Sequence, residues 1–140
     1  MRRIALALIV FLFCLSGLCQ AGTVSFTYGI NAADDPIPPR LRYPINEIAI
    51  LPPGEPLEFT WWNDLVDTRV FILKIYKGYN MYADNLIVRE ELSHNASTYN
   101  ADSALFNDGQ VYTWSLVRVT SAGYKSDRSF NSFKVVRNNG

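Results

Sequence analysis

The sequence predicts an all-β fold, a single antiparallel β-sandwich of about seven strands with an extra strand at its N-terminal end. Three observations indicate this class. Short runs of β-branched and aromatic residues recur along the chain, with turn residues between them. No segment has a sustained apolar period of 3.6 residues. All seven prolines fall within Pro36–Pro56, so the interior strands are expected after that window.

The first segment, Met1–Ala21, is predicted to be a secretory signal peptide. Two arginines precede an apolar run, Ile4–Leu18, which is shorter than the roughly 20 residues needed to span a bilayer. Small side chains at Cys19 and Ala21 suit cleavage after Ala21. A lipid anchor on Cys19 is the alternative, although the bulky Leu18 fits such a signal poorly. We expect a secreted, periplasmic or cell-envelope protein without a transmembrane segment after cleavage.

Residues 22–39 are predicted to form an N-terminal strand and a proline-rich approach to the sandwich. In Thr23–Ile30, apolar and small or polar residues alternate with a period of two, and a flexible segment follows. This strand could pair with its own sheet or with the sheet of a second copy. Pairing within the chain is favoured, because a strand's own domain is always at high effective concentration.

The sandwich itself is predicted over residues 40–137, followed by a tail at 138–140. Its strands are expected at Leu57–Trp61, Val70–Tyr76, Asn85–Glu91, Gln110–Thr120 and Ser129–Val136, with shorter pieces at Ile48–Leu51 and Ala104–Phe106. Asp84–His94 also fits a short helix. The proline window should contain loops and edge strand only, because proline cannot donate to a β-ladder. Alternation assigns the following large rings to the core: Phe59, Trp61, Tyr112, Trp114 and Phe133.

From Leu57–Trp61 through Phe106–Trp114 to Phe133–Val135, the chain resembles the fibronectin type III-like (immunoglobulin-like) domains of bacterial envelope or secreted proteins. Phe106, Gly109 and Tyr112 occupy the places of the family's corner. The resemblance implies that the Tyr112 hydroxyl bonds back to the preceding turn. Arg118 departs from the pattern, which has a small apolar residue there, and implies that this strand leaves the core early. The chain contains no Arg-Gly-Asp recognition loop, which gives integrin binding no support.

Composition excludes several function classes. Both cysteines lie in the signal segment, so the mature chain has no disulfide scaffold, no cysteine-ligated metal and no thiol nucleophile. Removing the signal leaves 11 Lys and Arg against 13 Asp and Glu, without a basic cluster. We therefore expect no nucleic-acid partner.

The residues also indicate no enzyme, no catalytic residue, no metal and no cofactor. The single histidine, His94, has no recognisable nucleophile, and Glu58 with Glu90 belongs to no glycosidase motif. The aspartates lack the spacing of a calcium loop. The glycosylation sequon at Asn95 matters only in a eukaryote, whereas the resemblance points to bacteria.

Outward aromatic side chains are the main functional signal. Core packing does not account for Trp62, Tyr76, Tyr79, Tyr82 and Tyr124. In addition, the outward side of one predicted sheet carries an apolar set, formed by Val70, Ile72, Tyr76, Val117, Val119 and Val136. This set marks either a covered surface or strands in which bulges turn Val119 and Val136 inward. The candidate partner- or ligand-binding residues are Trp62, Tyr76, Tyr79, Tyr82, Ile72 and Val117.

The predicted function is that of a non-catalytic, exported interaction module. It would bind another envelope or extracellular protein through aromatic side chains on its sheet face and loops. A first alternative is a carbohydrate-binding module that uses Trp62 with Tyr76, Tyr79 and Tyr82. A second is a self-assembling subunit joined by exchange of the N-terminal strand.

Overall fold

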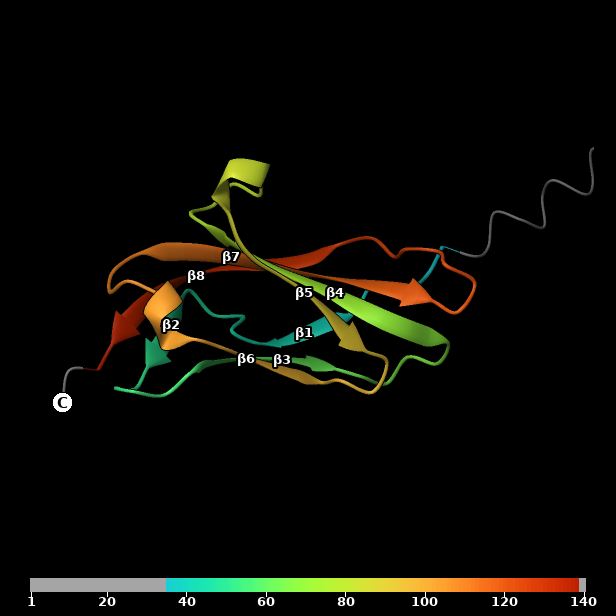
Figure 1. Cartoon of the computed structure of the whole chain (residues 1–140), viewed down its shortest axis with the longest axis horizontal. Helices are drawn as coiled ribbons and strands as arrows, with labels where there is room; N and C mark the ends of the chain where they lie inside the picture. Colours follow the sequence, from blue (N-terminus) through green and yellow to red (C-terminus); the bar gives the residue numbers. More distant parts are fainter. Residues whose placement is uncertain (1–34, 139–140) are drawn as a thin grey trace, which may run out of the picture. The chain divides into compact units, whose positions relative to one another are not determined.

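The computed structural model describes residues 35–138, which form a two-layer β-sandwich (Figure 1). The elements are β1 (Arg40–Tyr43), β2 (Ile48–Leu51), β3 (Leu57–Trp62), β4 (Thr68–Lys77), η2 (Ala83–Asn85), β5 (Leu86–Ser93), β6 (Thr98–Ala101), η3 (Ser103–Leu105), β7 (Val111–Thr120) and β8 (Ser129–Arg137). No helix in this part of the chain is long and apolar enough to cross a membrane. The signal segment with Cys19 and the strand predicted at Thr23–Ile30 lie outside the described residues.

One sheet has the strand order β1-β3-β6 and the other has the order β2-β8-β7-β4-β5. This is a fibronectin type III-like sandwich, which confirms the predicted fold class. The described residues form eight strands rather than about seven, and β2 pairs with β8 in parallel, whereas the other pairs are antiparallel. The first edge strand divides at Pro44, which cannot donate to a ladder, so that β1 joins one sheet and β2 joins the other.

Most strands begin and end within two residues of the predicted limits. The predictions were wrong in two places. The short edge strands β1 and β6 were missed, and the strand expected at Ala104–Phe106 is replaced by the 3-10 helix η3. The Asp102 carboxylate accepts a hydrogen bond of 2.9 Å from the Ala104 N–H, which starts the helical turn. Asp84–His94 is a 3-10 turn followed by β5.

Phe59 lies at the centre of the aromatic core. Its ring centroid is 5.1 Å from that of Trp114, 5.9 Å from that of Phe133 and 6.2 Å from that of Phe106. All four side chains are almost fully buried, and the predicted core set of large rings is confirmed. The Trp114 indole N–H donates to the Pro44 carbonyl at 2.8 Å, which ties the divided first strand to the core.

The corner implied by the family resemblance is present. The Tyr112 hydroxyl donates to the Leu105 carbonyl at 3.3 Å and accepts from the Asn107 N–H at 2.9 Å. Gly109 has a φ of +71°, a left-handed conformation that favours glycine. Tyr112 therefore holds the turn before β7 through its hydroxyl and packs its ring into the core.

Replacing Tyr112 by phenylalanine is expected to lower the free energy of unfolding by about 1.5 kcal/mol. The ring and its edge contact with Phe106, at 5.0 Å between centroids, are kept. Two hydrogen bonds are lost, and the Asn107 N–H is left without its partner. Urea unfolding should show a lower midpoint with an unchanged slope; an unchanged midpoint would mean that the hydroxyl contributes nothing.

The strand does not end at Arg118, and Leu116 is its last residue in the hydrophobic core cluster. β7 continues to Thr120, and Arg118 is only 5% exposed. Its guanidinium donates to the carbonyls of Val66 at 2.9 Å and Ile37 at 3.1 Å, and more weakly to that of Asp67 at 3.5 Å. An arginine is tolerated at the end of the core because backbone carbonyls satisfy its donors.

Candidate functional site

The connection between β4 and β5, residues 78–85, stands out on the side of the five-stranded sheet that faces away from the other sheet (Figure 1). We call this side the outer face and the connection the capping loop. Gly78 starts the loop with a φ of +82°, and its carbonyl accepts a hydrogen bond of 2.8 Å from the Thr113 hydroxyl on β7. Asn85 closes the loop through its side-chain amide, which donates to the Asn80 carbonyl at 3.1 Å.

The capping loop covers part of the outer face. Thr113 is fully buried although it points outward, and its register partner Tyr76 is only 3% exposed. Tyr76 and Val119 are buried without belonging to the central core cluster. Part of the predicted apolar set is therefore covered by the chain's own connections. Tyr76 was wrongly predicted to be available to a ligand, because its outward ring is covered within the chain.

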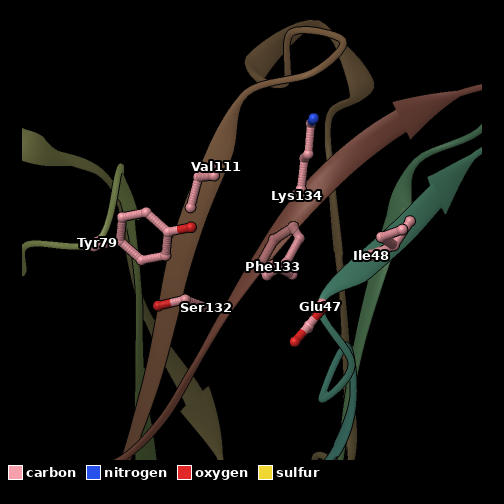
Figure 2. Close-up of a pocket in the computed structure, with 7 residues that line it drawn as sticks. All are labelled: Glu47, Ile48, Tyr79, Val111, Ser132, Phe133 and Lys134. Atoms are coloured by element: carbon pink, nitrogen blue, oxygen red, sulfur yellow. The ribbon is translucent and has the colours of Figure 1, made fainter.

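A pocket of about 450 Å³ lies on one side of the capping loop. Its lining residues are Glu47, Ile48, Tyr79, Val111, Ser132, Phe133 and Lys134. Figure 2 shows Tyr79 on one side, Glu47 and Ile48 on the other, and the residues of β7 and β8 between them. The pocket thus combines an aromatic ring with a carboxylate, an ammonium group and a hydroxyl.

An open groove, also of about 450 Å³, is lined by Met81 of the capping loop and by residues of β7, β8 and their connection. Its lining residues are Met81, Val117, Lys125, Ser126, Asp127, Arg128 and Phe130. Phe130 is 59% exposed. It lies two residues from Ser132 on the same side of β8, so the groove and the pocket are neighbours.

Four of the predicted site residues are part of this outer-face region. Ile72 and Val117 are paired across β4 and β7 and are half buried. Tyr79 and Tyr82 are exposed on the capping loop. The sequence prediction missed Phe130 and Met81. Phe130 lies three residues before the inward-facing Phe133 on β8, so the alternation of the strand could have placed it outward. Nothing in the sequence places Met81 beside β8.

Trp62 does not join this group, because it lies on the outward side of the other sheet. Arg40 pairs with Trp62 across β1 and β3, and its Cζ atom is 5.6 Å from the centroid of the indole ring. The Cζ atom of Arg42 is 5.1 Å from the same centroid. The predicted site residues therefore belong to two separate surfaces.

The carboxylates considered as a catalytic pair lie on different sheets. Glu58, on β3, accepts a hydrogen bond of 3.0 Å from the Thr98 hydroxyl. Glu90 lies on β5 at the edge of the other sheet. Burial raises the pKa of Tyr99 above its ordinary value, and the negative charge of Glu90 raises it further.

The sequence matches no protein-family model and no curated protein. Among solved structures, an Fn3-like protein from Clostridium thermocellum is 16% identical with a TM-score of 0.49, and the match covers 76% of this chain and 100% of that one. The fibronectin(III)-like modules of CbhA from the same organism are 12% identical with a TM-score of 0.48, over 72% of this chain and 99% of that one.

The spore cortex lytic enzyme SleM of Clostridium perfringens is 17% identical with a TM-score of 0.47, and the match covers 70% of this chain. The matched part is 29% of the length of that enzyme, so this chain spans less than a third of it. The binding properties of this chain therefore have to be derived from its own side chains.

Proposed function

We propose that this chain is an exported, non-catalytic binding module that docks another envelope or extracellular protein on its outer face. The proposal rests on one observation: exposed aromatic side chains lie beside the groove and the pocket. Phe130, Tyr79 and Tyr82 are 59%, 71% and 68% exposed. Large aromatic rings rarely stand in solvent together on a monomer unless a partner covers them.

The residue types of this region favour a protein partner. Tyrosine, phenylalanine, methionine and arginine are enriched at protein interfaces. The groove supplies Phe130, Met81 and Arg128, and the Arg128 guanidinium contacts the Met81 sulfur at 3.5 Å. The chain's own hydrogen bonds hold the capping loop, so a partner would meet a preorganised surface. Export is supported by the signal pattern of Met1–Ala21.

Site-specific photocrosslinking in cells that produce the protein tests this function. A photoreactive benzoyl-phenylalanine at Phe130 or at Tyr79 should give an adduct with the same protein species. The matched control carries it at Glu58, which is exposed on the other sheet, and should give no such adduct. Equal adducts from all three positions, or none from Phe130 and Tyr79, would contradict a docking surface on the outer face.

The pocket beside Tyr79 favours a second candidate function, the binding of a neutral oligosaccharide. An exposed tyrosine ring lines it together with Ser132, Glu47 and Lys134, which carry a hydroxyl, a carboxylate and an ammonium group. Such a mixture of one aromatic face with several hydrogen-bonding groups suits a sugar ring. On a glycan array, binding that is lost in Tyr79→Ala but kept in Phe130→Ser would favour this candidate over protein docking.

A further inference from the structure

We propose that the outward side of the three-stranded sheet binds an acidic polysaccharide, one whose sugar rings carry carboxylates. The binding site is formed by Trp62, Arg40 and Arg42, and we call it the Trp62 platform. It lies on the opposite sheet from the docking surface proposed above and is independent of it.

Both arginines lie beside one half-exposed indole ring. Trp62 is 47% exposed at the end of β3. Arg40 is its register partner on β1, and Arg42 lies where the register between the two strands shifts, so that both guanidinium groups approach the ring. Cation–π contacts orient the two guanidinium groups and leave their charge in place.

The charge of the platform calls for an anionic ligand. The Asp64 carboxylate forms an ion pair with Arg40. Among the described residues, no carboxylate pairs with Arg42. Arg42 therefore keeps its planar set of N–H donors for an external group, and a carboxylate matches that set with two parallel hydrogen bonds.

The surroundings of the platform favour a polysaccharide over a protein. In the part of the chain that is described, Trp62 is the only large apolar side chain on the outward side of β1, β3 and β6. The rest of that side is polar and formed by Glu58, Thr60, Thr98 and Asn100. A protein partner would need several apolar contacts there. A sugar chain needs only the exposed part of this one ring, beside the two guanidinium groups that lie over it, and a row of hydroxyl, amide and carboxylate groups for its hydroxyls.

A titration with a hexameric uronic acid, and with the same hexamer after methyl esterification of its carboxyls, tests the proposal. Isothermal titration calorimetry reports binding in every variant, including Trp62→Ala, which lacks the exposed indole. Trp62→Ala should weaken the binding of both hexamers at least about tenfold. Arg42→Gln should weaken only the binding of the acidic hexamer, and Asp64→Asn should strengthen it by freeing Arg40 from its ion pair.

Arg89→Gln, at an exposed arginine of the other sheet, is the matched control, and its affinity for both hexamers should equal that of the native protein. The proposal is overturned if the acidic hexamer shows no saturable binding, or if Trp62→Ala binds it unchanged. It is also overturned if a hexaglutamate peptide binds as tightly as the sugar, since the platform would then recognise acidic chains in general. None of these outcomes bears on the outer face, where Phe130 and Tyr79 lie.

Discussion

Replacing Phe59 by alanine is expected to lower the free energy of unfolding by about 4 kcal/mol. The side chain is fully buried, and its ring meets Trp114, Phe133 and Phe106 from three other segments of the chain. Removing it leaves a cavity that these large rings cannot fill without abandoning their own contacts. The loss includes the apolar transfer free energy and the edge-to-face contacts between the rings.

Urea unfolding of Phe59→Ala and Phe59→Leu measures this effect. The leucine variant keeps most of the buried volume and should lose about 1.5 kcal/mol. The control is Glu58→Ala, since the preceding side chain on the same strand is exposed, and it should change the free energy of unfolding by less than about 0.5 kcal/mol. An alanine variant at position 59 that loses no more than the leucine variant would show that the aromatic cluster is not the centre of the core.

Replacing Arg118 by methionine is expected to lower the free energy of unfolding by about 3 kcal/mol. Methionine keeps much of the buried apolar stem, but it leaves the carbonyls of Ile37 and Val66 without their charged donor. Because Ile37 belongs to the proline-rich approach and Val66 to the connection before β4, both segments should loosen together.

Backbone ¹⁵N relaxation at Ile37 and Val66 distinguishes this role from general packing. In Arg118→Met, both amides should become more mobile, while the amides of the corner around Tyr112 should relax as in the native protein. Arg118→Lys keeps the charge but lacks the planar fork, so it should recover only part of the stability. The exposed arginine of β5 provides the control, and Arg89→Met should unfold as the native protein does. Full stability in Arg118→Lys would show that charge alone is sufficient.

Alternation along the sequence predicted the long strands well, because each has one side against a core of large rings. It assigned Phe59, Tyr112 and Trp114 to the core correctly. The edge strands β1 and β6 were missed, since Arg40–Tyr43 lies between prolines and Thr98–Ala101 contains only one β-branched residue. What stabilises them is pairing with β3, which is a long-range contact that no local pattern contains.

The sequence predicted the candidate surfaces less completely than it predicted the core strands. Alternation along β4 was sufficient to place Tyr76 on the outward side of its strand but gave no sign that its ring would be buried. The sequence grouped Trp62 with Tyr79 by chemical type, whereas the topology places them on opposite sheets. The backbone carbonyls that accept from Arg118 belong to segments far away in the sequence, so the pattern around Arg118 gave no sign of them.

The two outward sides of the sandwich have different chemistry. The outer face presents several aromatic side chains beside a groove and a pocket, whereas the three-stranded sheet presents one tryptophan among polar groups. An exported module with both surfaces would attach to a protein on one side and to an acidic glycan on the other. The substitutions proposed at Phe130 and Trp62 separate these two roles experimentally.

The most direct test of the docking proposal is hydroxyl-radical footprinting of the protein in the cells that produce it, compared with the purified protein. A covered outer face predicts that Phe130 and Tyr79 are several-fold less oxidised in cells, while Leu105, which is 39% exposed on η3, is oxidised equally in both samples. Equal oxidation of Phe130 and Tyr79 in the two samples would contradict the account.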